Sequence, residues 1–116
     1  MPAANVALDR TLAALADPTR RRVIELLLDG PKPAGELAQA QGLSAPAMSR
    51  HLRVLRTRGL VAAERGEPLD SRLHIYRLRR APFKRLRSWL DDVEDYWHDQ
   101  LSAFKAHAER GRGRRP

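Results

Sequence analysis

The side chains that most often perform covalent or metal chemistry are sparse in this sequence. It contains no cysteine, which excludes disulfides, thiolate metal sites and cysteine nucleophiles. Its four histidines lie on four separate stretches with no evident carboxylate and nucleophile beside them. Neither a glycine-rich phosphate loop nor a serine in a nucleophile elbow is present. We therefore expect no enzyme and no cofactor.

Metal-binding residue types do recur at helical spacing near the C-terminal end. Asp91, Asp95 and His98 stand at positions i, i+4 and i+7, so they share one face of a helix. One interpretation is a zinc or nickel site that a second copy of the chain completes. The interpretation that we favour is a solvated acidic face, so we predict no metal site.

Positive charge is the most distinctive chemical feature, and it is concentrated. The formal net charge is +8, and residues 44–80 hold nine arginines against three acidic residues. Residues 1–43 are balanced, with five basic and five acidic residues. Such localised charge is typical of a protein that binds a polyanion. No signal peptide and no apolar stretch of membrane-spanning length is visible, so we expect a cytoplasmic protein without a membrane partner.

Within the cationic region, residues 44–57 predict a short helix with two different faces. Met48, Leu52 and Leu55 form an apolar stripe that can pack on a core. Ser44 is a suitable N-cap, and the first turn tolerates Pro46. The opposite face carries small residues and then arginines, which can approach a surface closely and reach phosphates or guanine edges. A merely solvated basic face is the alternative.

The elements around this helix predict a mainly helical fold with a small β-hairpin. Two helices are expected over residues 5–16 and 18–29, the second capped by Asp17 and burying Val23, Ile24, Leu27 and Leu28. A stiff linker at 31–33 and a short helix at 34–41 precede the basic helix. The two short helices and their glycine-containing turn form a helix-turn-helix pattern.

A β-hairpin is expected after the basic helix, over residues 60–65 and 72–78, which completes a winged helix in the order α-α-α-α-β-β-α. Arg65 and Arg72 of this hairpin could lie along a phosphate backbone or simply be solvated. Three more arginines, at positions 20–22, oppose the dipole of the second helix. They could be a solvated cluster, contact a phosphate, or pair with acidic residues of the last helix.

A long amphipathic helix is expected over residues 82–108, about 40 Å in length. A small winged helix has no core long enough to cover its apolar stripe, so we expect a homodimer that covers it rather than an intramolecular core helix. The last helix would contribute Trp89, Leu90, Val93, Trp97, Leu101 and Phe104 to the predicted interface. One domain should span residues 1–109, followed by a disordered basic tail at 110–116.

Four segments resemble the ArsR/SmtB family of bacterial winged helix-turn-helix repressors. They are ALADPTRRR at 14–22, GELA at 35–38, LSAPAMSRHLRVLR at 43–56 and GLV at 59–61. The resemblance implies a homodimer built from the first and last helices, with Leu8 and Leu12 of the first helix in its interface. It also implies recognition helices in successive major grooves of a palindromic DNA operator, with wings on the flanking backbone. By position it assigns DNA contacts to Ser44, Ala45, Pro46, Ser49 and Arg50. Arg53 extends that face, and His51 is a boundary residue that could contact a phosphate.

The sequence departs from the metal-responsive members that it resembles. Residues 36–40 lack the expected cysteine motif, and His98 and His107 are nine residues apart instead of eleven. We therefore predict a repressor that does not respond to metals through cysteines. Its signal could be a small molecule held near Trp89, Tyr96 or Trp97, or it could have none. A winged helix that binds RNA or a protein, and a metal-responsive repressor that uses Asp and His of the last helix, are the alternatives.

Overall fold

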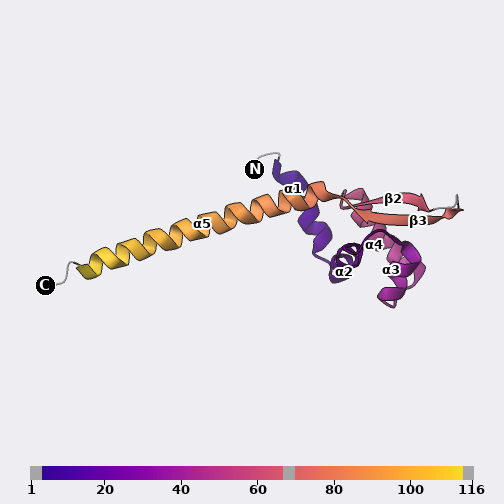
Figure 1. Ribbon diagram of the computed structural model, residues 1–116, viewed down its shortest axis with the longest axis horizontal. Helices are drawn as coiled ribbons and strands as arrows, with labels where there is room; N and C mark the ends of the chain where they lie inside the picture. Colours follow the sequence, from indigo (N-terminus) through magenta and orange to yellow (C-terminus); the bar gives the residue numbers. More distant parts are fainter. Residues whose placement is uncertain (1–3, 67–69, 114–116) are drawn as a thin grey trace. The chain divides into compact units, whose positions relative to one another are not determined.

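The computed structural model describes residues 4–66 and 70–113. Its helices and strands (Figure 1) follow the order α1 (Ala4–Leu15), α2 (Pro18–Leu27), β1 (Lys32–Pro33), α3 (Ala34–Ala40), α4 (Ala45–Thr57), β2 (Val61–Gly66), β3 (Asp70–Leu78) and α5 (Arg80–Gly113). The predicted fold class is confirmed, because the chain is mainly helical with a small antiparallel sheet, two strands of which form a hairpin after the fourth helix. The chain divides between Lys84 and Arg85 into two compact units.

Two helices, α2 and α4, begin at the positions that the sequence predicted from their N-cap residues. Asp17 caps α2 by accepting a hydrogen bond from the backbone N–H of Arg20 at 3.1 Å. Ser44 caps α4 by accepting from the backbone N–H of Ala47 at 3.2 Å. Each cap satisfies one of the N–H groups that a helix leaves unpaired at its start, and a proline follows directly or one residue later.

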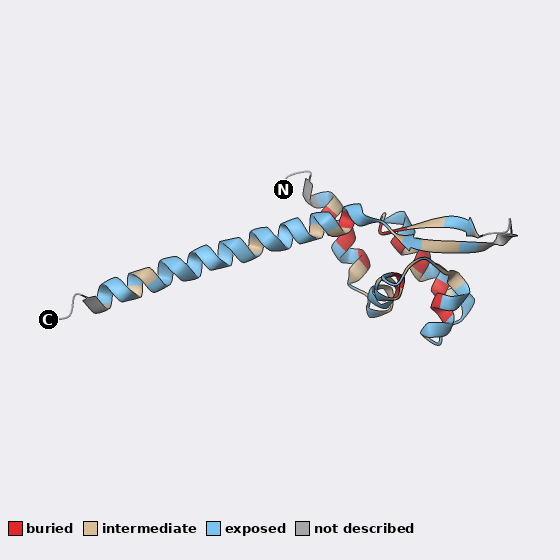
Figure 2. Ribbon diagram, viewed as in Figure 1, coloured by how far each residue is buried: buried red, intermediate tan, exposed pale blue. Residues whose placement is uncertain are grey.

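The core of the first unit lies where α2, α3 and α4 pack against the base of the hairpin. The predicted stripe of Met48, Leu52 and Leu55 is buried, as are Leu37 and Val23. Figure 2 colours the buried residues of the chain red. Burial of Leu28 was predicted wrongly, because its side chain is 71% exposed. It lies about 140° around the helix from Val23, outside the arc that faces the core.

The sheet has three strands in the order β1-β3-β2, one more than the sequence predicted. The expected linker at residues 31–33 contains β1, which pairs with β3 through Lys32↔Tyr76 and Pro33↔Ile75. Proline is tolerated here because β1 is an edge strand, where one N–H needs no partner. β2 and β3 form the predicted hairpin, with Ala63 opposite Tyr76 and Arg65 opposite His74.

Helix α5 has 34 residues and is longer than predicted. It begins at Arg80, two residues before Pro82, which fits the first turn of a helix. It continues to Gly113, so residues 110–113 of the predicted tail are helical, while 114–116 lie outside the described residues. Cationic Arg110 in its last turn favours this extension because it complements the helix dipole. No helix among the described residues is long and apolar enough to cross a membrane.

Candidate nucleic-acid interface

The turn between α3 and α4 fixes the direction of α4. Leu43 donates its backbone N–H to the carbonyl of Ala38 at 3.0 Å, and Gly42 donates to Gln39 at 3.2 Å. Gly42 has a φ of +63°, a conformation that a glycine adopts without strain. Gln41 then ties the turn to α2, because its Nε2 donates to the carbonyl of Thr19 at 3.2 Å. The turn therefore holds α4 against the rest of the first unit.

One face of α4 is exposed from its first turn to its last. The exposed members of the predicted DNA-contact set on and beside this helix are Ser44, Ala45, Pro46, Ser49, Arg50 and Arg53. The Ser44 oxygen accepts the capping hydrogen bond, so its hydroxyl hydrogen remains available to an outside acceptor. The start of the helix also carries unpaired backbone N–H groups and a positive dipole end, both of which favour an anion. We call these six residues the exposed face of α4.

The arginines of this face have no partner of opposite charge among the described residues. Arg50 and Arg53 form no ion pair there, whereas Arg20, Arg22 and Arg77 all contact carboxylates. Charge that the fold does not neutralise is available to a polyanion.

The wing carries a second set of cationic residues. Arg65 of β2 is exposed and stands opposite His74, which is exposed on β3. Arg72 belongs to β3, but its side chain is not among those that the structure describes. Nearby, Arg77 donates from Nε to Glu64 at 2.6 Å, which neutralises its charge within the hairpin. Among the described side chains of the wing, Arg65 is therefore the arginine that is exposed and forms no ion pair.

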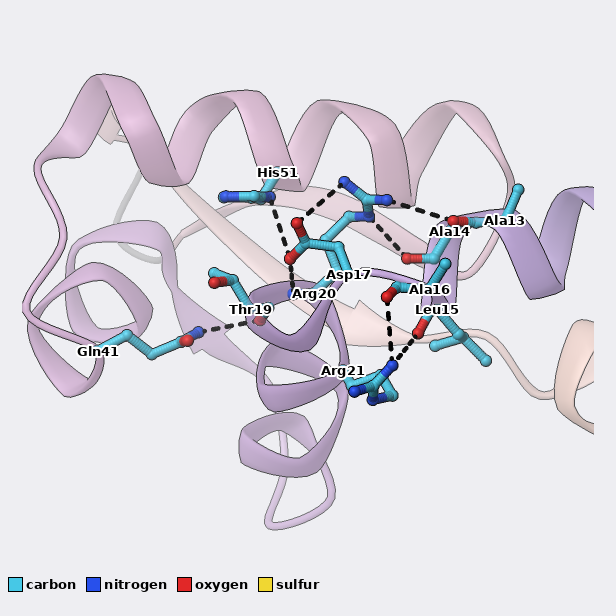
Figure 3. Close-up of polar contacts among 10 residues, drawn as sticks. All are labelled: Ala13, Ala14, Leu15, Ala16, Asp17, Thr19, Arg20, Arg21, Gln41 and His51. Carbon is cyan, nitrogen blue, oxygen red and sulfur yellow. Dashed lines mark hydrogen bonds and ion pairs between the residues drawn. The ribbon is translucent and has the colours of Figure 1, made fainter.

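His51 lies apart from the exposed face of α4. Its side chain is 25% exposed, and its Nδ1 is 3.9 Å from Oδ1 of Asp17 at the start of α2 (Figure 3). The geometry thus favours a contact between two helices for His51 over the phosphate contact that the sequence left open.

Figure 3 shows Asp17 between His51 and Arg20. Besides capping α2, its Oδ2 lies 4.0 Å from Nη1 of Arg20. The N–H of Arg20 lowers the pKa of Asp17 most, and the charges of His51 and Arg20 also lower it, while partial burial acts in the opposite direction. The carboxylate is therefore held in its ionised form.

Arg20 and Arg21 have a role that the sequence analysis missed. Arg20 donates to the carbonyls of Ala14 at 2.6 Å and Ala13 at 3.2 Å, and Arg21 donates to Leu15 at 2.8 Å. These carbonyls belong to the last turn of α1, where a helix supplies no i+4 donors. The carbonyl of Ala13 also accepts from the backbone N–H of Ala16 at 3.3 Å. Arg20 and Arg21 thus cap α1 and join it to α2. The signal available in the sequence was an arginine cluster only a few residues after the expected end of a helix.

Helix α5 presents apolar side chains that the chain itself does not cover. Trp89, Leu90, Trp97, Leu101 and Phe104 of the predicted dimer interface are 41–72% exposed, and Val93 is half-buried. In α1, Leu12 is 39% exposed. Leu8 is only 7% exposed in the single chain, so it offers the least surface of the eight.

Potential metal ligands do not converge within the described part of one chain. No group of three His, Cys, Asp or Glu side chains there could hold an ion. A site at Asp91, Asp95 and His98 would therefore require ligands from a second copy, as the sequence analysis stated for that alternative.

Comparisons with known proteins point to one group of regulators. The family model described as bacterial regulatory protein, arsR family, matches residues 17–63. The HTH-type transcriptional regulator Rv2034 of Mycobacterium tuberculosis is 38% identical over 96 residues, which is 83% of each chain. The structure of an ArsR-like transcriptional regulator from Rhodococcus sp. RHA1 superposes with a TM-score of 0.75, at 27% identity, covering 91% of this chain and 94% of that one. The homodimeric winged helix-turn-helix DNA-binding domain of Mb0332 from Mycobacterium bovis has a TM-score of 0.60 at 26% identity, covering 81% and 83%.

Proposed function

This chain belongs to the ArsR family of bacterial regulatory proteins, and we propose that it represses transcription as a homodimer bound to a palindromic DNA operator. The observation that carries this proposal is the exposed face of α4, a continuous surface of small residues and of arginines that form no ion pair with the described residues. The other side of this helix is buried. The family consists of transcriptional regulators rather than enzymes, in agreement with the absence of a catalytic set in the sequence.

The exposed face of α4 suits the major groove of DNA. The groove is about 12 Å wide and admits a helix, and Ala45 and Pro46 are small enough to let the first turn enter. Arg50 can then reach the acceptor edge of a guanine, the commonest specific contact of an arginine. Ser44, Ser49 and Arg53 are placed to contact phosphates, which set the register of the helix on the duplex. Arg65 and Arg72 of the wing would lie on the adjoining backbone.

Dimerisation through α1 and α5 would give the protein two copies of α4. The uncovered apolar side chains of α5 supply the surface for this association, and the homodimeric domain of Mb0332 supports it. Two recognition helices related by a two-fold axis read two half-sites about 34 Å apart, which requires a palindrome. A dimer bound there can block a promoter on the chromosome, which would place the protein in the cytoplasm.

The signal that releases the protein is a separate part of the proposal. Without a thiol, a cysteine metal site is excluded. Exposed Trp89, Tyr96 and Trp97 of α5 are the aromatic residues that could form a pocket for an organic effector once a second copy covers them. An Asp/His metal site on α5 remains the alternative for the same helix.

Fluorescence anisotropy tests the proposal directly. The full chain is titrated into labelled DNA from immediately upstream of its gene and into scrambled DNA of equal length, across a salt series, with chelator or with added zinc. We expect at least about a thousandfold preference for the upstream DNA, lost when the palindrome is broken and unaffected by zinc. Equal affinity for every DNA, or a preference for RNA, would contradict specific repression. Release by zinc would restore the metal-responsive alternative.

A further inference from the structure

A groove lies between the recognition helix and the wing, and it joins two of the DNA contacts proposed above, Ser49 and Arg53, to residues outside that set. Its volume is about 300 Å³, and its lining residues are Ser49, Leu52, Arg53, Arg56 and Tyr76. A water molecule occupies about 30 Å³ of liquid, so a groove of this size admits a phosphate group with part of its hydration shell.

The helix side of the groove is cationic. Ser49, Arg53 and Arg56 stand at positions i, i+4 and i+7, which brings them onto one side of α4. Both arginines are exposed, and neither forms an ion pair or a side-chain hydrogen bond with any residue that the structure describes. Two guanidinium groups in one groove repel each other, and a shared anion removes that repulsion.

The wing side supplies a hydroxyl on a rigid support. Tyr76 is half-buried and packs against the core, and its strand is held between β1 and β2. Among the described residues its hydroxyl has no hydrogen-bond partner. A phenolic hydroxyl can donate a hydrogen bond to an anionic oxygen.

Beyond the groove, the hairpin face that carries Tyr76 also carries cationic Arg65. Ala63 and Arg65 lie on the same face of β2, opposite Tyr76 and His74 on β3. Since side chains alternate between the two faces of a strand, Arg65 and His74 share the face of the hairpin that Tyr76 occupies. A chain of phosphates that enters the groove can therefore pass along this face to the exposed Arg65.

We propose that this groove is a binding site for one phosphate of the DNA backbone, held by the guanidinium groups of Arg53 and Arg56 and by the hydroxyl of Tyr76. The inference rests on the proposed function and adds Arg56 and Tyr76 to the residues that contact DNA. Its effect is to clamp one strand between α4 and the wing, so that the helix and the hairpin hold the same duplex in a single register.

Two substitutions test the groove, and a third serves as the matched control. Arg56→Gln removes one charge, and Tyr76→Phe removes only the hydroxyl while the ring still packs. Arg58→Gln also removes one positive charge near the C-terminal end of α4. It is the matched control because Arg58 is exposed but does not line this groove. Binding to the upstream DNA and to scrambled DNA is measured by anisotropy across a salt series.

The expected results separate the groove from a general effect of charge. Arg56→Gln should weaken binding to both DNAs by about tenfold and lower the slope of log K against log salt by about 0.9. Tyr76→Phe should weaken both similarly with little change in slope, and Arg58→Gln should change neither by more than about twofold. If Arg56→Gln and Tyr76→Phe behave like Arg58→Gln while the wild type still prefers its upstream DNA, the groove does not bind phosphate and the proposed function stands.

Neutral backbone analogues identify the phosphate itself. Each phosphate of the upstream DNA is replaced in turn by an uncharged methylphosphonate. One replacement per half-site should weaken wild-type binding but have little additional effect on Arg56→Gln, because the contact is already lost. Additive losses at every position would overturn the proposal. A wild type without preference for upstream DNA would instead contradict the proposed function.

Discussion

At the scale of single residues, Arg50 is the side chain on which sequence reading should depend most. It is exposed on α4 and unpaired among the described residues, so no contact within the fold competes with a base edge. We expect Arg50→Ala to weaken binding to the operator by about 10- to 100-fold, which corresponds to one lost bidentate contact to guanine. Binding to scrambled DNA should fall less than about threefold. Competition titrations with both DNAs measure the ratio, and equal losses would remove the base-reading role from Arg50.

Asp17 gives a prediction of how stability depends on pH. Its pKa is lower in the folded chain than its ordinary value of 3.8, chiefly because it accepts from the N–H of Arg20. The ionised carboxylate therefore stabilises the fold at pH values above about 4, and this contribution disappears as the pH falls through the lowered pKa. Asp17→Asn keeps an oxygen for the cap but loses the charge, so its deficit in unfolding free energy should be present at pH 7 and shrink toward pH 3.

Urea unfolding at pH 7, 5, 4 and 3 measures that deficit. Asp17→Ala, which also loses the cap, should cost about 1 kcal/mol at pH 7. Asp29→Asn is the matched control, since Asp29 is exposed and forms no ion pair with the described residues. A deficit for Asp17→Asn that stays constant from pH 7 to pH 3 would show that the charge does not stabilise the fold.

At the scale of elements, the wing should contribute affinity without reading sequence. Arg65 is exposed near the end of β2, on the face of the hairpin that it shares with Tyr76. We expect Arg65→Ala to weaken operator and scrambled DNA by the same factor and to lower the salt slope by about 0.9, the value for one phosphate contact. Anisotropy across a salt series provides both quantities. A loss restricted to operator DNA would indicate that Arg65 contacts bases.

The elements also show where sequence reasoning succeeds. The starts of α2 and α4 could be predicted because Asp17 and Ser44 act within three residues of themselves. The buried face of α4 was equally predictable, since its periodicity belongs to one helix. By contrast, β1 has two residues and exists only through pairing with Tyr76 and Ile75, more than forty positions away. No local pattern encodes such a contact.

The candidate site follows the same division. The exposed face of α4 could be predicted because it is the complement of a buried stripe. The contacts of Arg20 with the end of α1 and the approach of Tyr76 to α4 could not, since both depend on how separate elements meet. An arginine caps a helix when its guanidinium group lies within hydrogen-bond distance of that helix's last carbonyls, and otherwise it remains available to DNA. Residue type alone does not predict that distance.

At the scale of the whole molecule, the uncovered apolar stripe of α5 should decide the oligomeric state. Leu90, Trp97, Leu101 and Phe104 follow one another at steps of three, four or seven residues, so they form one stripe, and each is at least half exposed in the single chain. Such a stripe is unfavourable in water, and a second copy of the same helix would bury it.

Trp97→Glu tests this association at the centre of the stripe. Size exclusion with light scattering should show a change from a dimer to the monomer mass of 13.1 kDa, because a carboxylate buried in an apolar interface is costly. Ser102→Glu is the matched control, since Ser102 is exposed about 140° around the helix from Trp97 and should leave the dimer intact. The monomer should retain the core formed by α2, α3 and α4 and bind a single half-site weakly, without the affinity that two linked half-sites provide. If the Trp97→Glu protein remains dimeric, this stripe is not the main interface. If it is monomeric but binds the full operator as tightly as the wild type, dimerisation is not required for DNA binding.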